Sequence, residues 1–275
     1  MPDKAKLATG HLVFLLWAVA VGGYFVARGL FAAPDQTQGV LGLDAAYRIG
    51  GPSKLLAFVI ATYFASDVAR NFDADNPTRK AWLGLALGFT AFALGQGILV
   101  AHQLYIPGDT PFPSAADPSF MFGYVAIIAA LIHFVRAYMQ SGLVLAQPAA
   151  LWQSAGLVAL PLIVFCVVVT QAVLAKPDTA LQKTVGLGYP LLDAALLVPT
   201  FLMARLTMAM RGGQLALPWA LMLAGFVLFT CGDAIYAVPG ELNWKLLDPL
   251  LDLCFAVGYL LCAWGCYAQR RLVAV

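Results

Sequence analysis

The chain has 275 residues, which is enough for one or two soluble domains. Its composition excludes them, because hydrophobic residues make up 61% of the chain and charged residues only 11%, against roughly 25% charged residues in a soluble domain. The mean hydropathy is +0.82, and the net charge of +2, without a basic stripe, excludes nucleic acid as a partner. We therefore expect an all-α integral membrane protein in contact with the lipid bilayer.

Eight apolar runs are long enough to cross a bilayer as helices of about 20 residues. Short connections that carry Pro, Gly and Asp separate them, as turns between spans should. The predicted spans are residues 12–31, 52–68, 82–105, 117–139, 149–174, 187–208, 218–238 and 246–267.

The first run follows Lys4 and Lys6, so a secretory signal is the alternative to a span. The apolar stretch over residues 12–33 is longer than the roughly 7–15 residues of a signal core. Phe31 also disrupts a small-residue cleavage site at Ala33. We therefore predict a membrane span.

Lys and Arg divide ten to six between the two sides that the spans define. The richer side is expected to be cytoplasmic. An even number of spans places both termini on this side, so we expect the N- and C-termini in the cytoplasm. The ten residues are Lys4, Lys6, Arg70, Arg79, Lys80, Arg136, Arg205, Arg211, Arg270 and Arg271.

A pattern of Trp, Gly, Phe, Asp and Tyr residues recurs after about half the chain. Four spans in each copy would give the two copies the same orientation. We predict an eight-helix bundle built from two parallel four-helix repeats, residues 1–145 and 146–275. The matched pairs are Trp82 and Trp219, Gly88 and Gly225, Phe92 and Phe229, Gly95 and Gly232, Asp117 and Asp252, Gly123 and Gly258, and Tyr124 and Tyr259.

Charges inside a span are costly, so each one needs a reason. Asp193 and Asp233 lie about two turns inside their spans from the outer side, and Asp252 also lies below the outer boundary. All three are too deep to cap a helix, so we predict one cavity or one interhelical polar network. Asp117 has a simpler interpretation as a helix N-cap, because Pro118 follows it at the position where proline commonly begins a helix.

Other polar side chains lie at a similar depth. Tyr124 and Tyr259 follow Asp117 and Asp252 by seven residues and therefore share their helix faces. Gln96 occupies the place of Asp233 in the first repeat. The sequence predicts an outward-opening polar cavity that takes a small or lipid-like ligand or a cation. The predicted site residues are Asp193, Asp233, Asp252, Asp117, Gln96, Tyr124, Tyr259 and His102.

Two charges at span ends have simpler interpretations. Lys54 begins the second span from outside and is placed to neutralise an acid. Asp67 lies near the inner end of the same span, where we expect it to pair with Arg70.

Neither a catalytic residue nor a metal site is predicted. The five cysteines lie in apolar stretches without a C-x-x-C pair, which is typical of packing residues. His102 and His133 differ in depth by roughly 24 Å, too far to ligate one haem iron, although His11 is close to the level of His133. The sequence assigns no cofactor.

The repeated motifs resemble those of a known family of membrane regions. Pro113-Ser-Ala-Ala-Asp117 followed by Gly123-Tyr124, and Asp252 followed by Gly258-Tyr259, resemble a bacterial multi-pass membrane sensor region. This region precedes GGDEF diguanylate cyclase domains and some histidine kinase domains. The resemblance covers about residues 82–138 and 188–271, and it implies a sensor in the inner membrane. Only four residues follow Arg271, so we expect signalling through a separate cytoplasmic or membrane partner.

Three functions remain open. The favoured one is a non-enzymatic sensor or accessory subunit that binds a ligand in the outer half of the bundle. An intramembrane lipid hydrolase similar to the eight-span lysoplasmalogenases would use the paired acids and His102 to activate water, but the sequence lacks a nucleophile motif or HExxH. A small-solute transporter would fit parallel repeats, although the outward bias of the acids counts against it.

Overall fold

The computed structural model describes residues 4–33, 36–106, 110–140, 148–209, 214–237 and 244–273. These residues form eight long helices, and each contains a stretch apolar and long enough to cross a membrane. The eight predicted spans are therefore confirmed as helices of an all-α membrane protein. They are α1 (Lys4–Phe31), α2 (Leu43–Arg70), α3 (Pro77–Tyr105), α4 (Asp117–Gln140), α5 (Pro148–Ala175), α6 (Ala180–Ala209), α7 (Ala216–Ala237) and α8 (Trp244–Val273).

Three helices begin seven to nine residues before the positions that the sequence predicted: α1 at Lys4, α2 at Leu43 and α6 at Ala180. The predicted starts at Pro52 and Leu187 fall inside α2 and α6. For α2, the proline at the edge of the apolar run looked like a helix start. In a membrane bundle, however, a helix tolerates an internal proline, because its neighbours satisfy the freed backbone groups. Pro52 and Pro190 are such internal prolines.

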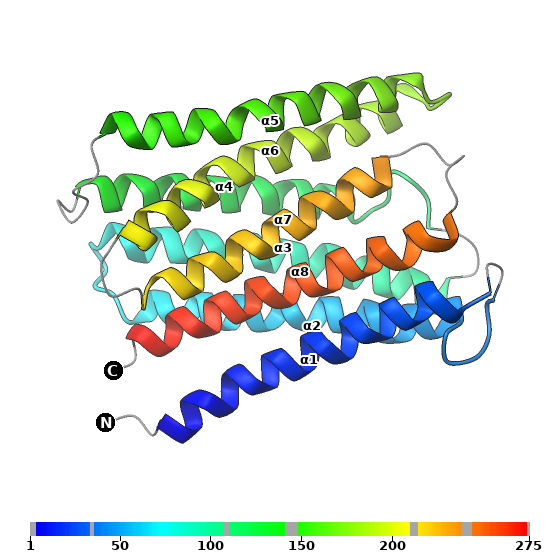
Figure 1. Cartoon of the computed structure of the whole chain (residues 1–275), viewed down its shortest axis with the longest axis horizontal. Helices are drawn as coiled ribbons and strands as arrows, with labels where there is room; N and C mark the ends of the chain where they lie inside the picture. Colours follow the sequence, from blue (N-terminus) through cyan, green and yellow to red (C-terminus); the bar gives the residue numbers. More distant parts are fainter. Residues whose placement is uncertain are drawn as a thin grey trace.

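Six of the helices form a closed ring. Each packs on the next in the order α2, α3, α4, α6, α7 and α8, and α8 packs on α2. The other two helices lie outside this ring: α1 packs against α8 and touches α2, while α5 packs against α6 and touches α7. In Figure 1 they flank the bundle, α1 at the bottom and α5 at the top.

Successive helices alternate in direction, so α1 begins and α8 ends at the same end of the bundle (Figure 1). We call this end of the bundle the termini end and the other the opposite end. The opposite end corresponds to the side that the sequence predicts to face outward.

Aromatic side chains fill the inside of the ring. Phe92 of α3 and Phe229 of α7 belong to helices on opposite sides of the ring, yet their rings meet with centroids 5.5 Å apart. Closer to the termini end, the rings of Trp82 and Trp219 lie 6.1 Å apart, and Phe134 contacts both. The ring therefore encloses a packed core.

Inside the ring, glycines let neighbouring helices approach closely. A Cβ on Gly88 of α3 would lie 2.3 Å from Cγ1 of Ile127 on α4. A Cβ on Gly225 of α7 would lie 2.7 Å from the backbone oxygen of Gly258 on α8. Small residues of this kind drive close helix packing in membranes.

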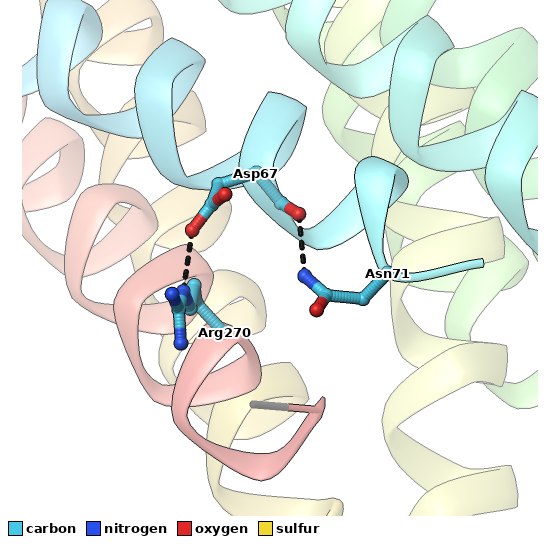
Figure 2. A network of polar contacts seen from close by, with 3 residues as sticks. All are labelled: Asp67, Asn71 and Arg270. Atoms are coloured by element: carbon cyan, nitrogen blue, oxygen red, sulfur yellow. Dashed lines mark hydrogen bonds and ion pairs between the residues drawn. The ribbon is translucent and has the colours of Figure 1, made fainter. Parts of the chain in front are cut away.

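An ion pair joins α2 and α8 near the termini end. Arg270 of α8 donates from Nε to Oδ2 of Asp67 on α2 (Figure 2). Asn71, which ends α2, donates from Nδ2 to the backbone oxygen of Asp67 at 2.7 Å. The expected pairing of Asp67 with Arg70 is therefore wrong: the packing of α8 against α2 brings a more distant arginine to this carboxylate.

Candidate functional site

The centre of the candidate site is one tyrosine held between two carboxylates. The hydroxyl of Tyr124 on α4 lies 2.8 Å from Oδ1 of Asp193 on α6 and 2.7 Å from Oδ2 of Asp233 on α7. Tyr124 and Asp193 are fully buried, with 0% of each residue exposed. The second carboxylate oxygen of Asp193 is also buried and finds no hydrogen-bond partner.

Hydrogen counting limits the charge of this cluster. A phenol carries one hydrogen, so Tyr124 can donate to only one of the two carboxyl groups. The second contact is a hydrogen bond only when the other carboxyl holds a proton and donates it to the phenol oxygen. The geometry therefore fits a pair of carboxyl groups that holds at least one proton and carries at most a single negative charge.

A second carboxylate–tyrosine contact lies beside the first. Tyr189 of α6 donates its hydroxyl to Oδ1 of Asp117, the first residue of α4, at 2.5 Å. The rings of Tyr189 and Tyr124 are neighbours, with centroids 6.1 Å apart. These contacts form one continuous polar cluster between α4, α6 and α7, which we call the α4–α6–α7 cluster.

The start of α4 explains how Asp117 reaches this position. Asp117 accepts from the backbone N–H of Ser114 at 2.5 Å through Oδ2, while the hydroxyl of Ser114 accepts from the N–H of Ala116 at 3.2 Å. This reciprocal arrangement is a capping box in which aspartate takes the usual place of glutamate. The capping bonds use Oδ2, and Oδ1 is left for Tyr189.

A narrow cavity leads to the cluster. Its volume is about 40 Å³, enough for a few water molecules. It runs from the α5–α6 connection, where Lys176 and Asp178 lie, to Asp233 and Tyr189 inside the bundle. The lining residues are Phe112, Val173, Lys176, Asp178, Gln182, Gly186, Tyr189, Pro190, Asp233 and Tyr236.

The two acids of the cluster therefore differ in access. Asp233 is partly exposed and lines the cavity, whereas Asp193 lies behind Tyr124 without exposure. A small group entering from the opposite end would meet Asp233 first. Its effect would reach Asp193 through the hydroxyl of Tyr124.

Asp252 lies at the other junction of the ring, between α2 and α8. Its Oδ1 accepts from Nζ of Lys54 on α2 at 2.9 Å. The interpretation of Lys54 as a partner for an acid is thus confirmed. In the recurring sequence pattern, Asp252 matches Asp117, whose partner is Tyr189.

The structure brings four of the eight predicted site residues together and places the other four elsewhere. Asp117, Tyr124, Asp193 and Asp233 form the α4–α6–α7 cluster. Of the remainder, Asp252 pairs with Lys54. Tyr259 packs its ring on Phe58, with centroids 4.1 Å apart.

The other two predicted residues lie on α3. Gln96 is buried there, and His102 lies near the opposite end, with Nδ1 3.4 Å from the hydroxyl of Thr110.

The sequence pattern did not single out Tyr189. It lies four residues before Asp193 and therefore on the same face of a predicted helix, so helical spacing was the available signal. Lys176, Asp178 and Gln182 also line the cavity but lie just before or at the start of a span, where polar residues are ordinary.

Among the described residues, no three His, Cys, Asp or Glu side chains converge as a metal site requires. The cysteines of this part of the chain are free thiols. The site therefore offers carboxyl groups, tyrosine hydroxyls and a small cavity.

No protein-family model, curated protein or solved structure matches the chain. Its classification therefore rests on its own helices and their packing, and they make it an eight-helix multi-pass membrane protein.

Proposed function

We propose that the protein is a membrane sensor or accessory subunit that binds a small cationic ligand in the outer half of the bundle and signals through a separate partner. The observation that carries this proposal is the hydroxyl of Tyr124, which contacts carboxyl groups from α6 and α7 at once. Ligand binding at Asp233 would redistribute these bonds, and three helices would respond together.

The chemistry of the α4–α6–α7 cluster favours a cation. Asp193 and Asp233 offer carboxylate oxygens, and Oδ2 of Asp193 has no hydrogen-bond partner. A buried acceptor without a donor is costly. A proton, an ammonium group or a small metal cation would supply the missing positive charge.

Two features favour binding over transport or catalysis. Contact between Phe92 and Phe229 across the ring fills the centre where a solute pathway would run. The cavity that reaches Asp233, with a volume of about 40 Å³, holds a few waters but is too small for an acyl or ether lipid.

We also propose the two-repeat arrangement, with residues 1–145 and 146–275 as the units. Matching contacts in the two halves support it. A Cβ on Gly95 would lie 2.9 Å from Phe120, and a Cβ on Gly232 would lie 2.8 Å from Phe255. Each phenylalanine occupies the corresponding place in its own half.

The proposed location is the inner membrane of a bacterium, with the termini end in the cytoplasm. The distribution of basic residues supports this orientation. Arg70, Arg136, Arg205 and Arg270 lie in the termini-end parts of their helices. Accessibility of a cysteine placed at Arg48, at the opposite end, to a membrane-impermeant thiol reagent would test it.

The binding proposal is tested with cations as probes. The thermal midpoint of the purified protein in detergent would be measured with ammonium, sodium or potassium chloride at constant ionic strength. At least one cation should raise the midpoint of the wild-type protein. Asp193→Asn and Asp233→Asn should abolish that increase, because each removes one of the two carboxyl groups that would hold the cation while preserving shape.

Asp44→Asn is the matched control, since Asp44 is exposed on α2 at the same end of the bundle. It should respond to the cation as the wild type does. Equal responses of the wild type and both site variants would contradict the binding proposal.

The signalling proposal has a separate readout. Hydrogen exchange in the termini-end parts of α6 and α7 should change when the effective cation is added. Binding without any such change would contradict a sensory role while leaving the binding site intact.

A further inference from the structure

A second group of polar atoms lies away from the α4–α6–α7 cluster, on α1. Nε and Nη1 of Arg28 and the hydroxyl of Tyr24 are buried, and none has a hydrogen-bond partner. Tyr24 and Arg28 are four residues apart and share one helix face. Two buried guanidinium nitrogens without an acceptor are costly, because their N–H groups have lost hydrogen bonds to water and gained none in return.

Snorkelling accounts for only part of Arg28. An arginine at a membrane boundary ordinarily extends its charged end into water. Here Nε and Nη1 are covered, although Arg28 lies in the last turn of α1, about 5 Å from its end. This depth corresponds to the headgroup region of a bilayer.

The surroundings of Arg28 carry both signs of charge. Asp248, in the second turn of α8, lies within electrostatic range of Arg28 and Asp252. Lys54 already neutralises Asp252. Arg28 and Asp248 therefore remain as one positive and one negative charge close together, and no hydrogen bond joins them.

We infer that Tyr24, Arg28 and Asp248 bind a phosphoethanolamine group. The guanidinium and the phenol donate to phosphate oxygens, in the geometry that arginine favours for phosphate. The ammonium group donates to the carboxylate of Asp248. The ligand is a zwitterion, which matches one positive and one negative charge, and a phospholipid headgroup or free phosphoethanolamine would each supply it.

Native mass spectrometry of the full chain tests this site. The detergent-solubilised protein would be titrated with phosphatidylethanolamine, phosphatidylglycerol, phosphatidylcholine or free phosphoethanolamine. The expected result is preferential retention of the ethanolamine compounds. Phosphatidylglycerol lacks the ammonium group, and phosphatidylcholine lacks its N–H donors.

Comparing phosphatidylethanolamine with free phosphoethanolamine shows which of the two compounds supplies the bound group. Binding of the lipid alone identifies a headgroup site on the bilayer, and binding of free phosphoethanolamine shows that the site also takes the soluble compound. Retention of all three phospholipids to the same extent, with no binding of the free compound, would overturn the inference.

Variants separate this site from a simple Arg28–Asp248 ion pair. Arg28→Gln should weaken binding of the ethanolamine compound at least about tenfold, since it loses charged hydrogen bonds. Tyr24→Phe should weaken it less. Asp248→Asn should keep phosphate binding but remove the preference for ethanolamine over glycerol.

Arg48→Gln and Asp44→Asn are the matched controls, because both residues are exposed on α2 at the same end. Neither should change lipid retention. If Asp248→Asn leaves the selectivity intact, or Arg28→Gln binds like the wild type, the inference is wrong. The selectivity ratio is measured on folded protein, so a loss of yield does not obscure it.

Discussion

At the residue scale, the hydroxyl of Tyr124 distinguishes the first half of the chain from the second. Tyr259 of α8 matches Tyr124 in the recurring sequence pattern, but its ring packs on Phe58 and Phe229, and none of the described carboxylates accepts from it. Two residues of the same type, at matching positions, therefore have different chemical roles. The difference arises because α6 and α7 carry Asp193 and Asp233, where α2 and α3 carry Leu55 and Gln96.

Tyr124→Phe should destabilise the protein by about 1–3 kcal/mol, because it removes the hydroxyl that bridges the carboxyl groups of Asp193 and Asp233. Tyr259→Phe is the matched control and should cost much less. Thermal unfolding of both variants in the same detergent checks this. Equal losses would show that the hydroxyl of Tyr124 does not stabilise the cluster.

The proton held by this pair of carboxyl groups gives a spectroscopic prediction. At neutral pH, infrared spectra of the wild-type protein should contain the C=O band of a protonated carboxylic acid. Asp193→Asn should remove the band, because Asp233 can then accept from Tyr124 as a carboxylate. Asp44→Asn should leave it unchanged. Absence of the band from the wild type would contradict a protonated carboxyl group in the pair.

At the element scale, the α3–α4 and α7–α8 pairs depend on contact between backbones. Gly225→Ala places its Cβ 2.7 Å from the oxygen of Gly258, and only a shift of a whole helix relieves this contact. A Cβ on Gly88 would lie 2.3 Å from Cγ1 of the β-branched Ile127 and 3.0 Å from the backbone oxygen of Gly123. Gly225→Ala and Gly88→Ala should therefore each cost about 1–3 kcal/mol.

Gly156→Ala on α5 is the control for these variants, because no heavy atom lies within 4 Å of its Cβ position. Its thermal midpoint should equal that of the wild type. If the thermal midpoint of Gly225→Ala equals that of the wild type, α7 and α8 can move apart without a loss of stability, and the prediction is wrong.

At the scale of the whole molecule, the halves meet at two junctions of the ring. One junction is held by Lys54–Asp252 and Asp67–Arg270, and the other by the α4–α6–α7 cluster. Co-expressed fragments 1–145 and 146–275 should therefore assemble and co-purify. Reversing charge in the second fragment with Asp252→Lys and Arg270→Asp should reduce the yield of the complex, because like charges then face each other across α2 and α8.

Arg205→Asp provides the control, since Arg205 is exposed on α6. It should leave co-purification unchanged. Failure of the unmodified fragments to associate would show that these contacts are too weak to hold the halves together without a covalent link.

The existence of the helices and the presence of acids inside them were accessible from the sequence, because apolar length and rare intramembrane charges are strong local signals. The start of α2 was not, since tertiary packing decides whether a membrane helix continues through a proline such as Pro52. The division of the acids between two junctions was also inaccessible. It depends on the closure of the ring, which brings Arg270 to Asp67 and Lys54 to Asp252.

The paired indoles of Trp82 and Trp219 have an optical consequence. Their ring centroids are 6.1 Å apart and their planes are inclined by 42°, so their electronic transitions should couple and produce an exciton couplet in circular dichroism. One indole comes from each half of the chain, so the sign and size of the couplet would record how the halves are turned relative to each other. Phenylalanine at either position should remove the whole couplet.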